Sequence, residues 1–271
     1  MNNLIKTEWL KIKYYRAFWL LLGITALSYP GINYMFYSLY QKISEGKGQA
    51  NQAAMFFIGN PFSFPEAWHT VSYFSSYFVF IPAVVVIMFI TNEYTFKTHR
   101  QNIIDGWSRN QFMTSKLIDV AIISAIVTIL FTIIALVVGV INTNDVSGNI
   151  MDMIYYIGLF ALQTFSQLSL AFMVGFLVRK AFISLGIFLF YFIILEPILV
   201  KVAAFKFYDL GRFLPLAISD RMIPVPAFFA KFGKEAYDKN ISDIPLFTLL
   251  TILLTILIWF LCYKINNKRD L

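Results

Sequence analysis

The fold of this chain is constrained most by a series of apolar runs, each about twenty residues long. A run of about 20 apolar residues is long enough to cross the hydrocarbon core of a bilayer as a helix. Six such runs lie along the 271 residues, at about 17–40, 71–91, 115–141, 153–177, 181–200 and 244–263. The sequence therefore predicts an all-α integral membrane protein with six transmembrane helices. Because these spans account for about half of the chain, we expect a single transmembrane domain over 1–271 and no sizeable soluble domain.

The composition agrees with this prediction and argues against several functional classes. Hydrophobic residues make up 59% of the chain and charged residues only 14%, which is unlike a soluble domain. The single cysteine, Cys262, excludes an intramolecular disulfide and a cysteine-based metal cluster. The two histidines, His69 and His99, are predicted on opposite sides of the membrane, so we expect no metal site. The distribution of the net charge of +7 indicates membrane topology and contact with lipids, and not a nucleic-acid partner.

Basic residues are distributed unevenly among the connections, and this predicts the orientation. Lys and Arg concentrate in the N-terminal arm, in 92–116, in 178–181 and in the C-terminal tail. The alternate connections are poorer, with two lysines in 41–70 and none in 142–152, while seven basic residues in 201–243 are offset by five acids. Cytoplasmic connections carry the excess of Lys and Arg, and long loops count less in this rule. We therefore expect a multi-pass protein of the cell (cytoplasmic) membrane with both termini in the cytoplasm.

The polar connection 93–116, EYTFKTHRQNIIDGWSRNQFMTSK, is longer than a simple turn and shows signals of structure. Two pairs of residues fit a capping box, which begins a helix: Thr98 with Gln101, and Ser108 with Gln111. Gly106 is placed to end the first helix in a left-handed conformation. The sequence thus predicts a short cytosolic helix at about 99–105, a tight corner, and a new helix that enters the membrane.

The short helix carries two adjacent isoleucines, Ile103 and Ile104, among polar neighbours. Apolar side chains on a solvated helix need a cover. The local pattern favours two covers about equally: the protein's own spans or the lipid headgroups, and a partner protein. The other candidate residues of this region are Thr98, His99, Arg100, Gln101, Asn102, Asp105, Gly106 and Arg109.

Two further segments are predicted to lie at the membrane surface. In the N-terminal arm, 1–16, the side chains of Ile5, Trp9 and Ile12 fall on one side at helical spacing, which predicts an amphipathic interfacial helix. The long loop 201–243 contains apolar stretches that are too short to span. We expect these stretches to form short re-entrant or interfacial helices on the outer face, between the fifth and sixth spans.

A few polar residues inside the apolar runs are candidates for a substrate path. Gln163, Ser166 and Gln167 share one face of the fourth span, where they either bond to other helices or line a path or a subunit interface. Glu196 is the only acid well inside an apolar run. A charge in that position usually faces protein or water, although near the outer end of a span it can also reach the interface.

The remaining charged residues and motifs indicate no catalytic chemistry. Asp119 lies one turn after Lys116, where the two are expected to form an ion pair. The sequence holds no GxxxxGK[ST] phosphate loop, no HExxH, no GxSxG and no cysteine–histidine pair. We therefore expect a chain that is not an enzyme, binds no cofactor of its own, and serves transport or membrane anchoring.

Together these features resemble the permease subunits of the ABC-2 type, the integral membrane half of certain ATP-binding-cassette transporters. The matching features are the arm TEWLKIKYYRAFW, the segment NEYTFKTHRQNIIDGWSRNQFMTSKL after the second span, and the long, partly apolar loop before the last span. In this family the segment after the second span forms the coupling helix, which docks on the ATPase subunit. The resemblance therefore favours a partner protein as the cover for Ile103 and Ile104.

The resemblance implies a transporter with two permease subunits, identical or paralogous, and an ATPase subunit below each. ATP and Mg would be bound by the ATPase partner and not by this chain. Relatives mostly export lipids, glycans, peptides or drugs. The aromatic residues of 41–70, predicted as a belt or a partly inserted segment at the outer interface, favour a hydrophobic or amphipathic substrate. Two alternatives stay open: a self-contained channel or ion-coupled carrier that uses Glu196, and a membrane anchor or sensor that transports nothing.

Overall fold

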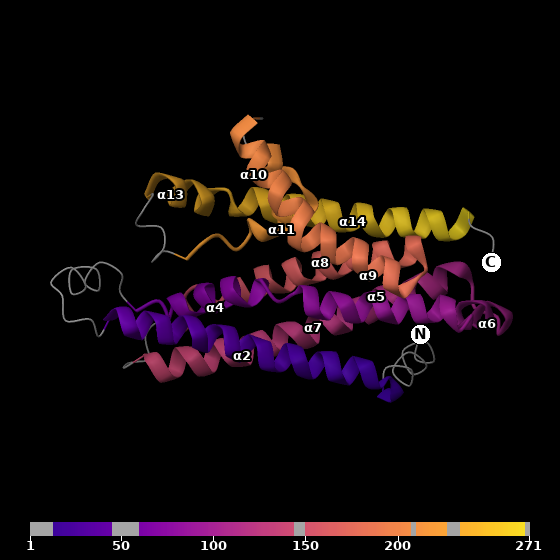
Figure 1. Ribbon diagram of the computed structural model, residues 1–271, viewed down its shortest axis with the longest axis horizontal. Helices are drawn as coiled ribbons and strands as arrows, with labels where there is room; N and C mark the ends of the chain where they lie inside the picture. The colour runs from indigo at the N-terminus through magenta and orange to yellow at the C-terminus, as the bar shows by residue number, and fades with distance from the viewer. Residues whose placement is uncertain (1–12, 45–59, 144–149, 207–209, 227–233, 269–271) are drawn as a thin grey trace.

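The computed structural model describes residues 13–44, 60–143, 150–206, 210–226 and 234–268. All regular secondary structure within these ranges is helical, in agreement with the predicted all-α class. The long helices run side by side along the long axis of the molecule, and α10 projects from them (Figure 1). The predicted interfacial helix at 1–16 falls almost entirely outside the described residues, so it stays a prediction.

Four segments are long and apolar enough to cross a membrane. They are α7 (Arg109–Asn142), α8 (Tyr155–Val178), α14 (Ile244–Lys268) and the segment Ala181–Phe205. The last of these is composite, because α9 (Ala181–Phe190), a π-helical turn labelled η1 (Tyr191–Leu195) and α10 (Glu196–Lys206) follow one another without a gap. A fifth span results when α4 (Glu66–Ser76) and α5 (Phe80–Thr95), which are bent by 50°, are taken together.

The first predicted span corresponds to α2 (Arg16–Ser44). This helix has 29 residues and is long enough to cross a bilayer. It is not among the spans found in the described residues, because Pro30, Asn33 and several tyrosines make it less apolar than α7, α8 and α14. The prediction of six spans is thus supported for four or five of them, and for α2 it stays a prediction.

The long helices pack around α8, which contacts α5, α7 and α14. Its buried side chains include Phe160, Phe172 and Phe176. Gly175 makes the contact with α5 close, because a Cβ atom at this position would lie 2.6 Å from Ile90 Cγ2. Close van der Waals packing of this kind is the main force between helices in a bilayer. α8 therefore forms the centre of the helix bundle, and the other long helices pack against it.

Short helices lie at the two ends of the bundle. α6 (Thr98–Ile104) lies at the end where α2 begins and α14 ends (Figure 1). Between α10 and α14 the chain forms η2 (Leu210–Phe213), α11 (Pro215–Asp220) and α13 (Lys234–Ser242). Of the short helices predicted on the apolar stretches of 201–243, α11 is present, whereas α13 lies on a polar stretch and 222–226 is not helical. Their relation to the membrane stays a prediction.

The aromatic residues just before α4 and in its first turn are buried, so the prediction of a belt at the outer interface is wrong for the described residues, while the alternative of a partly inserted segment stays a prediction. Phe62, Phe64 and Trp68 are at most 5% exposed. Trp68 Nε1 donates to the Ile150 carbonyl at 2.8 Å, and the Phe64 amide donates to Thr143 Oγ1 at 2.8 Å. These bonds hold the aromatic side chains against the neighbouring helices, which removes them from the surface.

Candidate functional site

The short helix α6 follows α5 directly and turns the chain back. Lys97 has a left-handed backbone, with φ 57°, and Thr98 is the first helical residue. The predicted capping box of Thr98 and Gln101 is therefore wrong, because Thr98 lies inside the helix. Its hydroxyl is bound elsewhere and donates to Glu93 Oε2 at 3.0 Å. Gln101 Nε2 donates to Asp105 Oδ1 at 2.9 Å.

The corner between α6 and α7 has the predicted geometry. Gly106 has a φ of +96°, which would strain a residue with a side chain. The Trp107 amide donates to the Asn102 carbonyl at 3.0 Å. Ser108 then begins α7 with the predicted capping box, since its Oγ accepts from the Gln111 amide at 3.2 Å and its own amide donates to Gln111 Oε1 at 2.8 Å. The corner is therefore fixed on both sides.

α6 has one face toward the protein and one face toward its surroundings. His99 and Asn102 are buried, each at 9% exposure. Ile104 is 77% exposed, and Ile103 is half-buried beside it. The exposed polar side chains of this segment are those of Arg100, Gln101 and Asp105. The two isoleucines therefore differ, and Ile104 is the apolar side chain that α6 presents outward.

Arg109, one of the candidate residues of this region, connects two long helices. Its Nη1 donates to the carbonyls of Asn266 at 3.3 Å and Asn267 at 2.9 Å. Asn266 Nδ2 donates in return to the Arg109 carbonyl at 2.9 Å. The start of α7 is thereby attached to the end of α14.

A buried charged cluster lies directly behind α6. Lys116 Nζ lies 2.9 Å from Glu93 Oε1 and 3.1 Å from Asp119 Oδ2, and all three side chains are at most 4% exposed. The ammonium also lies 4.8 Å from the Phe89 ring centre, a cation–π distance. The predicted pair of Lys116 and Asp119 is confirmed, whereas the sequence reasoning missed Glu93 as a partner. We call Glu93, Lys116 and Asp119 the Lys116 cluster.

The Lys116 cluster is linked to both α6 and α8. His99 Nδ1 donates to the Glu93 carbonyl at 3.1 Å. Burial lowers the pKa of His99, so its ring is neutral at pH 7. The His99 ring also lies 4.7 Å from the ring of Tyr94, and the Arg179 guanidinium, at the end of α8, lies 4.7 Å from the same Tyr94 ring. α6 therefore packs against α5 and α7. Its buried His99 also links it, through the Tyr94 ring, to Arg179 at the end of α8.

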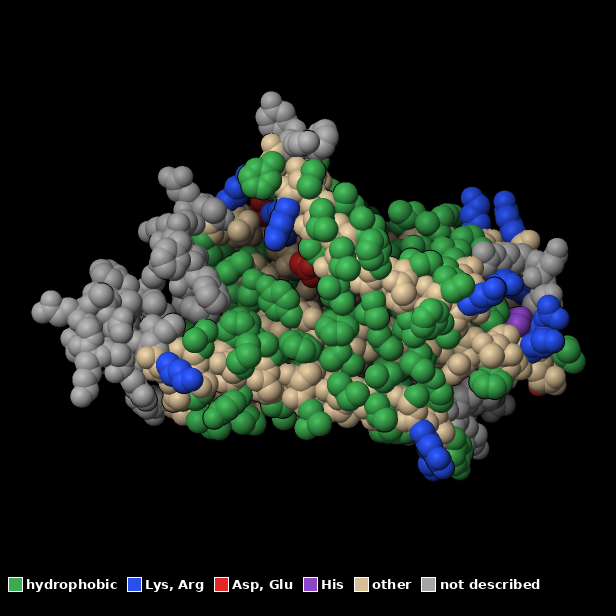
Figure 2. Space-filling view, in the orientation of Figure 1, with side chains coloured by type: hydrophobic (Ala, Val, Ile, Leu, Met, Phe, Trp, Pro, Cys, Tyr) green, Lys and Arg blue, Asp and Glu red, His purple; other side chains and the backbone are tan. Residues whose placement is uncertain are grey.

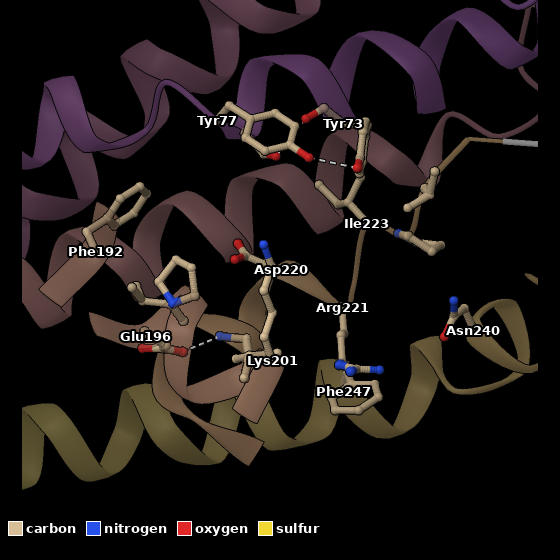
Figure 3. A pocket seen from close by; sticks show the side chains of 17 residues that line it. Tyr73, Tyr77, Phe192, Glu196, Lys201, Asp220, Arg221, Ile223, Asn240 and Phe247 are labelled. Atoms are coloured by element: carbon tan, nitrogen blue, oxygen red, sulfur yellow. Dashed lines mark hydrogen bonds between the residues drawn. The ribbon is translucent and has the colours of Figure 1, made fainter. Parts of the chain in front are cut away.

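A second group of polar residues surrounds a cavity of about 510 Å³ between α4, α10, α11 and α14 (Figure 3). We call it the Asp220 cavity. Tyr73 and Tyr77, whose hydroxyls lie 2.7 Å apart, form one wall, and Phe247 lies across the cavity from them. A space-filling view shows the hollow at the base of α10, with an acidic side chain inside it (Figure 2). Its size is that of a small-molecule site.

The two glutamines predicted for a substrate path do not line this cavity, but both bind Asp220, which does. Gln163 Nε2 and Gln167 Nε2 each donate to Asp220 Oδ1 at 2.8 Å, and Gln167 also donates to Ser219 Oγ at 3.0 Å. The glutamines thus attach α11 to α8. This corresponds to the first of their two predicted roles, bonding to another helix. Ser166 is buried on α8 and is not among the described residues that line the cavity.

Glu196 lines the same cavity from the start of α10 and is 2% exposed. Its Oε1 accepts from the Ala217 amide at 2.7 Å. Glu196 therefore faces the protein interior and the cavity, as a charged residue near a span is expected to do. The structure brings three of the four predicted path residues, Gln163, Gln167 and Glu196, together around α11.

Sequence reasoning missed Asp220, which is the residue that unites this group. Its side chain is exposed to the cavity although protein surrounds it on the other sides. Burial raises the pKa of Asp220 to about 6; the charge of Glu196 adds to this, and the bonds from Gln163 and Gln167 oppose it. The only sequence signal was an acid directly after the apolar stretch FLPLAIS, and nothing local connected it with the fourth span.

The fold and these two sites define a multi-pass helical membrane protein with a fixed short helix at one end and a cavity at the base of α10, on the side of the bundle (Figure 2). The family model described as ABC-2 family transporter protein matches residues 4–195, which is more than half of the chain. The chain belongs to this family and is a permease component of an ATP-binding-cassette transporter. Membership in this family generally implies association with an ABC ATPase subunit. A comparison with curated proteins gives no match.

Proposed function

We propose that the chain is the permease subunit of an exporter of hydrophobic or amphipathic substrates, driven by a separate ATPase subunit that docks on α6. The observation that carries this proposal is the division of α6 into two faces. Ile104 points outward at 77% exposure, whereas His99 and Asn102 are held inside at 9% exposure. An exposed apolar side chain on a rigidly held helix is suited to a partner's cleft.

The attachment of α6 supports its role as a lever. A short helix of seven residues is not stable alone, so its position is set by the bonds to Glu93 and by the corner at Gly106. When an ATPase subunit moves, α6 and the start of α7 are expected to move with it as one body. The Lys116 cluster would pass this movement to α5 and α7, because its members lie on both helices.

The orientation and assembly belong to the same proposal. Lys and Arg side chains gather at the α6 end of the molecule (Figure 2), which favours a cytoplasmic location for this end. Both termini would then be cytoplasmic in the cell membrane, and 201–243 would lie outside. A second permease subunit, identical or paralogous, would complete the transporter, and ATP and Mg would be bound by the ATPase subunits.

The test is retention of the ATPase subunit by variants of α6. Ile104→Asp should release the ATPase from the membrane fraction and abolish transport. Burial of one isoleucine contributes about 1.5–3 kcal/mol, which is roughly tenfold to a hundredfold in affinity. Ile103→Asp should weaken retention less, because Ile103 is half-buried in the permease itself.

Met151→Asp is the matched control, since Met151 is 71% exposed near the beginning of α8, away from α6. It should leave ATPase retention unchanged. Full retention and normal transport by the combined Ile103→Asp and Ile104→Asp variant would contradict the docking role of α6.

One observation supports the alternative of an ion-coupled carrier. Glu196 and Asp220 line one cavity, and paired acids are typical of ion or proton sites in membranes. Substrate movement into liposomes by the purified chain, without any ATPase, would favour this alternative over the exporter.

A further inference from the structure

We propose that the Asp220 cavity binds an organic cation with an apolar body, and that Glu196 and Asp220 attract its positive charge. As a statement about the substrate of the transporter, this inference rests on the proposed function. As a statement about binding, it concerns this chain alone.

Glu196 supplies the observation that points to a ligand. It is 2% exposed and lines the cavity, and its Oε1 is bound by the Ala217 amide at 2.7 Å. The other oxygen, Oε2, makes no hydrogen bond of good geometry with the described residues, although the Tyr191 hydroxyl and the Leu216 amide lie close enough to interact with the carboxyl. A buried carboxylate oxygen without a partner is costly, and a cation in the cavity would compensate it.

Asp220 places a second carboxyl at the same cavity, close enough to Glu196 for the two charges to repel each other. Its Oδ1 is held by Gln163 and Gln167 at 2.8 Å each, so the carboxyl is fixed where it faces the cavity (Figure 3). Two acids at one site repel unless a positive charge lies between or beside them. The site is therefore arranged for a cation before any ligand arrives.

The walls of the cavity are suited to the apolar body of such a ligand. Phe192, Pro197, Leu216, Ile223 and Phe247 contribute apolar surface, and Tyr73 and Tyr77 add aromatic rings. Aromatic faces attract cations, and this attraction strengthens where water is excluded. Charge and shape together favour an amphiphilic cation over an inorganic ion, because apolar and aromatic side chains make up most of the walls.

Two basic residues, Lys201 and Arg221, also line the cavity. Lys201 is exposed and forms no ion pair with Glu196 or Asp220 in the described parts of the chain. The Arg221 guanidinium lies 5.7 Å from the Phe247 ring centre, on the side of the cavity away from Glu196 (Figure 3). The acids are held by fixed amide donors, whereas Lys201 is a long, solvated side chain that a ligand can displace.

The experiment measures binding of tetraphenylphosphonium to the purified permease in nanodiscs of neutral lipid, with empty nanodiscs as the background. Tetraphenylborate, an anion of the same shape, is the second probe. We expect saturable binding of the cation at one site per chain, and no saturable binding of the anion. The double variant Glu196→Gln with Asp220→Asn should lower the affinity for the cation by about tenfold or more.

The two substitutions keep the oxygens that accept from Ala217, Gln163 and Gln167, so the fold should be retained, which thermal unfolding of each variant checks. Asp152→Asn is the matched control, because Asp152 is an exposed acid that does not line the cavity. The affinity of the Asp152→Asn variant for the cation should equal that of the unchanged chain.

Three results would overturn the proposal: no saturable binding of the cation, an unchanged affinity in the double variant, or saturable binding of the anion that Lys201→Met abolishes. The last result would assign the cavity to an anion. Since binding is measured without an ATPase subunit, each of these failures leaves the docking role of α6 untouched, and failure of that role leaves the binding result valid.

Discussion

At the scale of single residues, Lys116 is the most constrained position in the molecule. Its ammonium is shared by Glu93 and Asp119, and the side chain is 1% exposed. Removing the positive charge would leave two buried carboxylates facing each other. Loss of one partner in a buried ion pair typically costs about 3–5 kcal/mol. We therefore expect Lys116→Met to lower the thermal unfolding temperature strongly.

Lys264→Met is the comparison for this prediction, because Lys264 is exposed near the end of α14 and should tolerate the change. Adding Glu93→Gln and Asp119→Asn to Lys116→Met should recover much of the lost stability, since the Lys116 cluster then carries no charge. Equal unfolding temperatures for Lys116→Met and Lys264→Met would show that the Lys116 cluster does not stabilise the fold.

Asp220 predicts a dependence of cation binding on pH. Its pKa, raised to about 6 mainly by burial, means that the carboxyl is charged above this pH and neutral below it. A bound cation favours the charged form, so affinity should be high at pH 7.5 and fall as the pH is lowered toward about 5. Among the described residues, the charged and titratable groups that face Asp220 or line its cavity are Glu196, Lys201, Arg221, Tyr73 and Tyr77.

The measurement is the affinity for tetraphenylphosphonium across this pH range. Asp220→Asn should bind more weakly at pH 7.5 and should show a flatter profile, because the titrating carboxyl is gone. A profile that keeps its full slope in Asp220→Asn would assign the titration to another of the facing groups.

At the scale of elements, the corner between α6 and α7 separates docking from transmission. Gly106 has a φ of +96°, which a β-branched residue cannot adopt without strain. We expect Gly106→Val to keep ATPase retention, since Ile104 is unchanged, and to lose transport driven by ATP hydrolysis. Gly106→Asn is the matched variant, because Asn tolerates the left-handed region. The measurement is transport and ATP hydrolysis for both variants. Equal coupling of transport to hydrolysis in Gly106→Val and Gly106→Asn would contradict this role.

Local signals predicted the elements well where neighbours in sequence determine the structure. The capping box at Ser108, the left-handed Gly106 and the pair of Lys116 with Asp119 each involve residues at most three or four positions apart. Thr98 was assigned wrongly because Lys97, with a left-handed backbone, takes the N-cap position and Thr98 is the first residue inside the helix. A capping pattern cannot show where the preceding helix, α5, ends.

At the scale of the whole molecule, the apolar runs predicted a helical membrane protein, and the long-range contacts could not be read from them. The cavity depends on Asp220, which lies 57 residues after Gln163 and 53 after Gln167. A polar face on the fourth span indicated that something would bond there, but no pattern named the partner. The burial of Phe62 and Trp68 likewise could not be predicted from the sequence, because an interfacial belt and a buried aromatic segment have the same composition.

The orientation of the whole molecule has its own prediction. Gln101 in α6 and Asp152 before α8 are both exposed, and the native Cys262 is buried, so single cysteines can be introduced without changing the background. A membrane-impermeant thiol reagent added to intact cells should label Asp152→Cys and not Gln101→Cys. The opposite pattern would place α6 outside the cell, where no ATPase could dock.

The π-helical turn at Tyr191–Leu195 has a consequence for how this protein can change over evolutionary time. Such a turn takes up one residue more than an α-helical turn over nearly the same rotation. Glu196 is the first residue after it. Loss of a single codon within 191–195 would therefore restore a regular α-helix and leave the carboxyl of Glu196 directed at the cavity, whereas the same loss in a regular α-helical turn rotates the following residues by about 100°. The span can thus change its length at this turn with every side chain of the site kept in place.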